Sequence, residues 1–308
     1  MSPSKEFKPL IYTSTKADAR DADVFIHWPL TGKIVACFNF QVTPVTSHTL
    51  LRWFDMVVAW DIGLKPVLKK VEMEQRGLLE YYPRPLPSEE ALADSHILEP
   101  GTYACFAGAD SMDPPSDAAV HFQGQETSIM TLWERARRNK YNAGVRGRQQ
   151  AYDEIIAIPS EVVDQVSLPR DQCIFTGATS DAPAGQDVVL SWFFPPYLRG
   201  EITTYAATRE ISLGDISWRS HFNLVPMRAD VHQLWLQNAF SIDVADGHRI
   251  RIFSKDALDI GLPERLGNPN PEWDVYLTEH FRHTLVVQVI GGDIRVKYRW
   301  DAWDCGRR

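Results

Sequence analysis

Two segments of the chain carry the side chains that are best suited to chemistry. One is an aromatic run from Trp192 to Tyr197, preceded by Ser191, and in the other Trp235 follows His232 by three residues. That spacing places His232 and Trp235 on one face of a helix. Histidine exchanges protons near neutral pH, and aromatic walls around a few polar groups form pockets for apolar small molecules. The predicted substrate-binding residues are Trp192, Phe194, Tyr197, Trp235 and Ser191.

Strands and a helix must hold these side chains. Residues 173–177 and 187–196 are apolar and predict a hairpin, and residues 223–232 lead into a helix that carries His232. A second hairpin is expected around Asp246-Gly247, a dipeptide that is typical of tight turns. The predicted order from residue 171 to residue 253 is therefore strand, strand, loop, helix, strand, strand.

The remaining elements follow from local patterns. A last helix is expected to begin at Asp274 and to end at Gly291-Gly292, and Ser47 is expected to cap a helix. Strands are predicted at residues 23–28, 33–41, 64–73 and 101–107, and a loop at residues 83–87. The sequence thus predicts an α+β protein with an accessory α+β domain over 1–120, a helical connector over 121–167 and a further domain over 168–308.

Composition narrows the function classes. The 308 residues are 44% hydrophobic and carry a net charge of -8, which disfavours a nucleic-acid partner. A basic run from Arg135 to Arg148 either clamps an anionic ligand or forms a solvated helix face, and the second interpretation is favoured. Four scattered cysteines and the lack of about 18 consecutive apolar residues predict a protein of the cytoplasm or nucleus without a membrane partner.

The segments around the predicted pocket resemble the ββα-metal core of HNH endonucleases, in the divergent form of fungal HNH-like proteins. Arg170-Asp171-x-Cys173-x-x-Thr176-Gly177 is similar to the family's opening, and Asn223 to His232 is similar to its central asparagine and final histidine. The family's Ala-His-Ile-x-Pro strand corresponds to Ser191-Trp192-Phe193-Phe194-Pro195. The resemblance implies an HNH-like core with an extra hairpin and a terminal helix.

The same resemblance assigns a role to four positions. It places Ser191 at the first metal-ligand position, Trp192 at the base, Asn223 at the orienting residue and His232 at the last ligand. Tryptophan cannot accept a proton, and a serine hydroxyl is a poor ligand for a hard cation. Metal-dependent phosphodiester cleavage is therefore not expected from these residues.

The leading prediction is a repurposed HNH-like enzyme of fungal secondary metabolism that acts on an apolar small molecule. His232 and Asn223 are its predicted catalytic residues, and a cyclisation or isomerisation suits such a pocket. No cofactor is expected. The alternatives are a non-catalytic binding module, and a nuclease that holds Mg²⁺ at a displaced site containing Asp187, with Asp230 or His221 nearby in sequence.

Overall fold

The fold is α+β, as predicted, and its elements divide between two compact units. The computed structural model describes residues 12–29, 31–57, 66–75, 81–86, 92–108, 157–179, 187–196 and 217–294. The first unit contains Met1–Ile129 together with Gln288–Arg308, and the second contains Met130–Val287. The basic run from Arg135 to Arg148 lies outside the described residues, as do Tyr197 and most of the predicted connector. None of the described helices has the length and apolar character that a membrane crossing requires.

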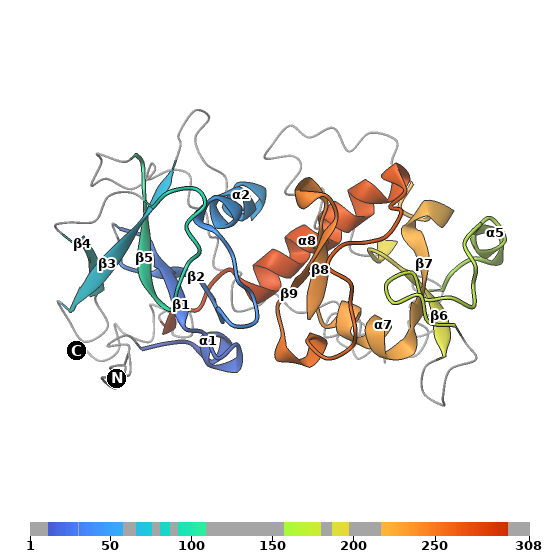
Figure 1. Ribbon diagram of the computed structural model, residues 1–308, viewed down its shortest axis with the longest axis horizontal. Helices are drawn as coiled ribbons and strands as arrows, with labels where there is room; N and C mark the ends of the chain where they lie inside the picture. Colours follow the sequence, from blue (N-terminus) through green and yellow to red (C-terminus); the bar gives the residue numbers. More distant parts are fainter. Residues whose placement is uncertain are drawn as a thin grey trace, which may run out of the picture. The chain divides into compact units, whose positions relative to one another are not determined.

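A five-stranded sheet with the order β2-β1-β5-β3-β4 forms the centre of the first unit (Figure 1). β1 and β5 run parallel, and the other neighbouring pairs are antiparallel. The predicted strands at 23–28, 33–41, 64–73 and 101–107 are confirmed, and the first two pair as a hairpin. The strands are β1 (Val24–His27), β2 (Ile34–Phe38), β3 (Val67–Gln75), β4 (Tyr81–Pro85) and β5 (Gly101–Phe106).

Strand β4 contradicts the predicted loop at residues 83–87. Residues Tyr81 to Pro85 pair with β3 alone, so β4 is an edge strand. Proline lacks an N–H and is tolerated at a sheet edge, where the missing donor would face solvent. Pro83 and Pro85 therefore fit this position, although a proline-rich segment is typical of a loop.

Helix α2 (Ser47–Val57) occupies the predicted position but begins with a different cap. The Thr49 N–H donates to Thr46 Oγ1 at 3.2 Å, which makes Thr46 the capping residue. Ser47 instead donates its hydroxyl to the Ala93 carbonyl at 2.6 Å. The short helix α1 (Thr15–Ala19) completes the described helices of this unit.

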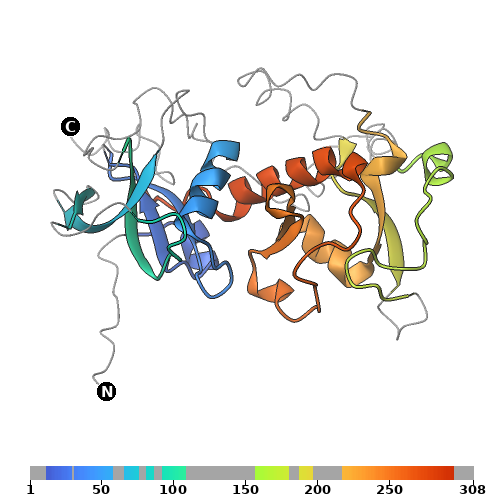
Figure 2. The same cartoon turned by 45° about the horizontal axis from the view of Figure 1, so that its top comes forward.

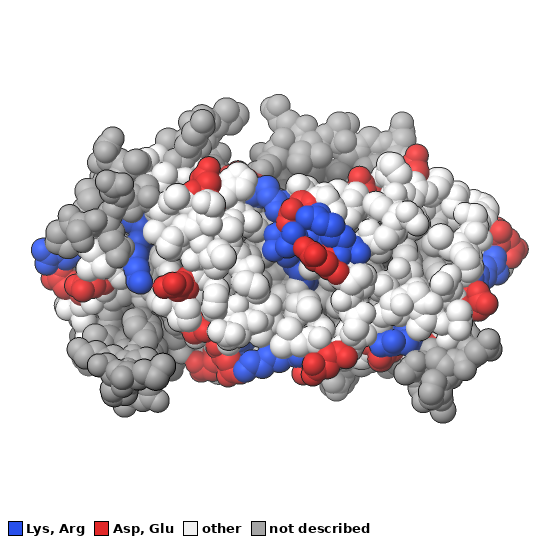
Figure 3. Space-filling view, viewed as in Figure 1, with Lys and Arg blue, Asp and Glu red and all other residues white. Residues whose placement is uncertain are grey.

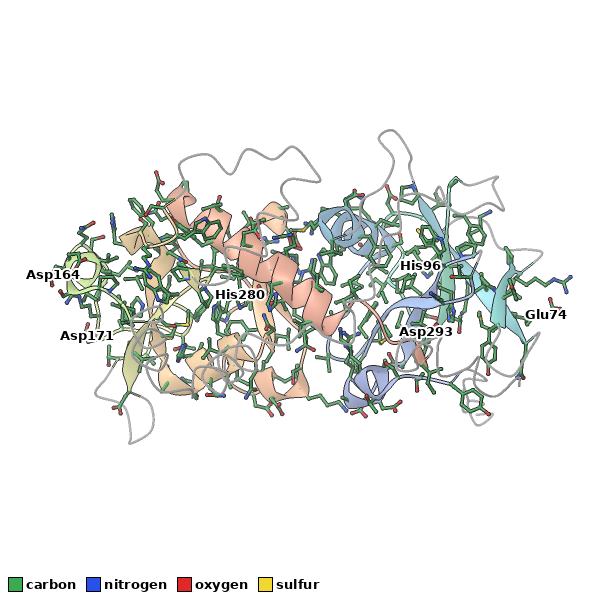
Figure 4. The ribbon with its side chains drawn as sticks, turned by 180° about the vertical axis from the view of Figure 1, so that it is seen from behind. Glu74, His96, Asp164, Asp171, His280 and Asp293 are labelled. Atoms are coloured by element: carbon green, nitrogen blue, oxygen red, sulfur yellow. The ribbon has the colours of Figure 1, made fainter. Side chains whose placement is uncertain are left out.

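The end of the described chain returns to the sheet of the first unit. The Cys37 N–H donates to the Val289 carbonyl at 2.9 Å, and the Gly291 N–H donates to the Val35 carbonyl at 2.8 Å. Asp293, which is labelled in Figure 4, accepts the Ile34 N–H with its Oδ2 at 2.8 Å. The predicted domain over 168–308 thus includes a segment that packs with the first unit.

Two antiparallel strands followed directly by a helix form the part of the second unit that carries His232. β6 (Val188–Trp192) pairs with β7 (Leu224–Arg228), and α7 (Ala229–Leu236) begins at the next residue. The sequence predicts that residues 173–177 pair with β6, but they form a tight turn closed by the Gly177 N–H on the Cys173 carbonyl at 2.8 Å. Gly177 has a φ of 70°, a left-handed conformation that glycine adopts without strain.

The second predicted hairpin is confirmed. The last helix is confirmed in its position, but it ends at Gln288 rather than at Gly291-Gly292. β8 (Phe240–Asp243) pairs with β9 (Arg249–Ile252) across a turn in which Gly247 is left-handed. Helix α8 (Asp274–Gln288) runs beside β8 (Figures 1 and 2). The shorter helices are α5 (Ser160–Val163), η2 (His221–Asn223), η3 (Val244–Asp246), η4 (Lys255–Ala257) and η5 (Pro271–Trp273).

Candidate functional site

Ser191 and His232 form a hydrogen-bonded pair between β6 and α7. The Ser191 Oγ lies 2.8 Å from His232 Nε2. The pairing of β6 with β7 places Ser191 opposite Val225, and α7 starts at the end of β7, so His232 in its first turns lies over Ser191. The pair therefore results from strand register and from the direct strand-to-helix junction.

Burial sets the protonation state of His232. Its ring is partly exposed, and the loss of solvation lowers the pKa of His232 below its ordinary value. A neutral ring at pH 7 has one nitrogen that carries a proton and one that accepts. When the proton is on Nδ1, the Ser191 hydroxyl donates to Nε2. No partner of Nδ1 occurs among the described residues.

Asn223 lies directly before β7, next to β6, but its side chain hydrogen-bonds to main-chain groups. Its side chain is fully buried, its Oδ1 accepts the Phe194 N–H at 3.0 Å, and its Nδ2 donates to the carbonyls of Phe194 and Trp218 at 2.7 and 2.9 Å. Its own carbonyl accepts the Phe193 N–H at 2.8 Å. An amide with these partners has little left to offer a substrate, so Asn223 fixes the end of β6 instead.

The aromatic side chains do not line one pocket. Trp192 is 6% exposed and packs with Val166 and Leu224, on the side of β6 away from His232. Trp235 is fully buried in the main core of the unit and donates its indole N–H to the Phe193 carbonyl at 2.9 Å. Side chains alternate along β6, so Trp192 points away from the side on which α7 carries Trp235. The predicted shared pocket is therefore wrong, and the two tryptophans belong to separate packing clusters.

Phe194 also belongs to the core. It is 3% exposed, and its ring centroid lies 5.9 Å from that of Trp218 in an edge-on arrangement. Tyr197, the fifth predicted pocket residue, lies outside the described residues. Of the four predicted pocket residues that the structure describes, Ser191 alone is hydrogen-bonded to His232.

The described residues do not form the displaced metal site. Asp187 is exposed and precedes Ser191 by four residues, which along a strand is about 13 Å. Burial acts to raise the pKa of Asp230, but two hydrogen bonds from Arg228, at 2.5 and 2.8 Å, and one from the Val231 N–H lower it below its ordinary value. No group of three or more His, Cys, Asp or Glu side chains with metal-site geometry occurs in the described part of the chain.

A second serine and histidine pair, which sequence reasoning missed, lies deeper in the same unit. The Ser241 Oγ is 2.7 Å from His280 Nδ1, and His280 Nε2 is 3.2 Å from the Trp235 carbonyl. His280, labelled in Figure 4 on α8, is fully buried and stacks on the Trp235 ring at 3.4 Å. Residues so distant in sequence carry no local signal of their contact.

Charged side chains of the β8-β9 hairpin pair with one another. Asp246 contacts Arg251 at 2.6 Å and Arg249 at 3.1 Å, and Arg249 also contacts Glu264 at 2.9 Å. On the face shown in Figure 3, Lys and Arg lie beside Asp and Glu. These arginines are neutralised locally and do not form a free anion site.

Comparisons with protein families, curated proteins and solved structures find no match to this chain.

Proposed function

We propose that the chain is an HNH-like protein whose metal-dependent centre is replaced by a serine and histidine acid–base pair. The observation that carries this proposal is the 2.8 Å contact between Ser191 Oγ and His232 Nε2. The resemblance puts these residues at the two metal-ligand positions, which must lie side by side on a strand and the following helix. Their contact supports a common geometry with a different donor set.

The donor set argues against ordinary nuclease chemistry. Mg²⁺ requires hard oxygen ligands, usually carboxylates, and a hydroxyl with one imidazole is a weak substitute. Asp187 precedes Ser191 by four residues, which is about 13 Å along a strand. Trp192, at the position of the base, faces a hydrophobic cluster rather than His232.

A neutral histidine suits proton-transfer chemistry on a small molecule. His232 is uncharged at pH 7 because partial burial lowers its pKa, so it acts as a base without first losing a proton. Cyclisation and isomerisation are reactions that need only such transfer. Trp235, Phe194 and Asn223 support this centre by fixing the strand end and the helix rather than by touching the substrate.

The cellular setting belongs to the same proposal. The resemblance to fungal HNH-like proteins points to small-molecule metabolism in a fungal cytoplasm, with an uncharged or weakly charged substrate. A non-catalytic binding module draws support from the complete burial of Trp235 and the near-complete burial of Trp192, which leaves the aromatic residues as packing elements. The partial exposure of the His232 ring favours the enzyme.

The test uses 5-nitrobenzisoxazole, an uncharged probe whose ring opens when a base removes one proton. Wild-type protein should open the ring, His232→Ala should not, and Ser191→Ala should retain activity because the base remains. His221→Ala is the matched control, since His221 is also a partly exposed histidine of this unit. A wild-type rate no higher than that of His232→Ala would reject the proposed acid–base function.

A further inference from the structure

The two serine and histidine pairs of the second unit differ in what surrounds the imidazole. In Ser241–His280 both side chains are fully buried, and the second ring nitrogen contacts the Trp235 carbonyl. In Ser191–His232 the ring is partly exposed, and only Nε2 has a partner among the described residues. The first pair is closed and structural. In the second pair Ser191 is itself buried, at 9% exposure, and a reacting molecule would approach along the partly exposed His232 ring.

We infer that Ser191 is a nucleophile activated by His232, and that this centre transfers acyl groups from uncharged esters. The inference rests on the proposed function, because it requires His232 to act as a base. A serine hydroxyl is a weak nucleophile until an adjacent base accepts its proton. The 2.8 Å separation is within the range for that transfer.

The reaction balances with water as the acyl acceptor. The Ser191 proton moves to His232 Nε2 as Oγ bonds to the carbonyl carbon. The bond to the leaving alkoxide then breaks, and the alkoxide takes the proton from Nε2 to leave as an alcohol. Water next attacks the acyl ester and gives a proton to Nε2, which returns it to Ser191 Oγ as the carboxylic acid leaves.

The surroundings of Ser191 favour an uncharged substrate. Val225 lies opposite Ser191 on β7, and Val189 shares its face of β6. Apart from His232, the charged or titratable side chains of β6, β7 and α7 are Arg228 and Asp230, which bind each other through two hydrogen bonds. A carboxylate or phosphate on the substrate would therefore find no free counter-charge on these three elements.

An alkyl fluorophosphonate tests the nucleophile directly, because it reacts with activated serines and releases fluoride. Peptide mapping of the full-length protein should place the adduct on Ser191, with none on Ser241, whose histidine partner is fully buried. Ser191→Ala should abolish the adduct. His232→Gln keeps a hydrogen-bonding side chain near Ser191 but removes the base, so labelling should slow by about 100-fold or more.

Two results would overturn the inference. One is a folded wild-type protein, with unchanged circular dichroism, that gives no adduct on Ser191. The other is labelling of Ser191 at the same rate in wild type and His232→Gln, which would make the pair a structural contact. In either case, His232-dependent opening of 5-nitrobenzisoxazole would leave the proposed function standing, whereas loss of both reactions would remove it too.

Discussion

Ser191 and Trp192 are neighbours in the chain but face opposite sides of β6, and this alternation decides their roles. Ser191 meets His232 of α7, while Trp192 packs with Val166 and Leu224. The sequence of β6 is almost continuously apolar and shows no two-residue alternation, and the resemblance to HNH proteins places Trp192 at the reaction centre. Composition alone does not say which face of a strand meets the helix.

Trp192 should behave as a core residue. Replacing Trp192 with alanine should lower the free energy of unfolding by about 3 to 5 kcal/mol, the range for deleting a large buried aromatic. Its indole N–H is buried without an acceptor in the described residues, so Trp192→Phe should cost far less. Urea denaturation of both variants measures this difference, and a negligible effect of Trp192→Ala would mean that Trp192 faces an open pocket.

Asn223 should matter for stability more than for chemistry. Asn223→Ala leaves main-chain groups of Phe194 and Trp218 unpaired in the interior and should cost about 3 kcal/mol. Asn270→Ala is the control, because it removes only the cap on the Glu272 N–H and should cost about 1 kcal/mol. If Asn223→Ala kept its stability but lost probe turnover, Asn223 would be catalytic, as the sequence predicts.

At the scale of elements, local patterns identify most helices and strands but not their partners. The turn at Asp246-Gly247 and the helix from Asp274 follow from short-range signals. Residues 173–177 have strand-like composition, yet Gly177 adopts a left-handed conformation and the segment turns back on itself. The partner of β6 lies beyond a long intervening segment, where no short-range signal can identify it.

His280 joins three of these elements, and its neutrality should make the second unit sensitive to acid. It contacts Ser241 of β8 and the Trp235 carbonyl of α7 from its position on α8. Burial, with a smaller effect of His283, holds the pKa of His280 well below 6.5. The unfolded chain takes up this proton near pH 6.5, so the contribution to stability is complete above that pH and is lost as pH falls from there toward the folded pKa.

Urea denaturation between pH 7.5 and 5.5 measures this effect as a fall in the free energy of unfolding. His232 contributes in the same direction, since its pKa is also lowered by burial. His232→Gln should therefore keep most of the fall in the free energy of unfolding between pH 7.5 and 5.5. In His280→Gln this fall should be much smaller. An equal slope in wild type and His280→Gln would exclude His280 as the source.

At the scale of the whole molecule, the first unit contains both ends of the chain, and the residues of the second unit lie between them in the sequence. Residues 289–293 hydrogen-bond to β2 of the first unit, after α8 has completed the second. Composition shifts and loops predict the succession of domains along the chain, but they do not predict this return. Ile290 pairs with Ala36, which is distant in the sequence, and no local pattern identifies such a partner.

Gly292 should be the residue on which this return depends. Its φ is +116°, and a Cβ there would lie 2.5 Å from Cys37 Sγ, so Gly292→Ala combines backbone strain with a steric clash. We expect the free energy of unfolding to fall by about 2 to 4 kcal/mol, with the loss confined to the first unit.

Gly267→Ala is the matched control, because a Cβ at Gly267 would meet no atom within 4 Å and its φ is not in the left-handed range. Thermal unfolding should then show an earlier transition in Gly292→Ala alone, while fluorophosphonate labelling of Ser191 at about 25 °C stays at the wild-type rate. Loss of labelling in a Gly292→Ala protein that is still folded at that temperature would contradict the expectation that the stability loss is confined to the first unit.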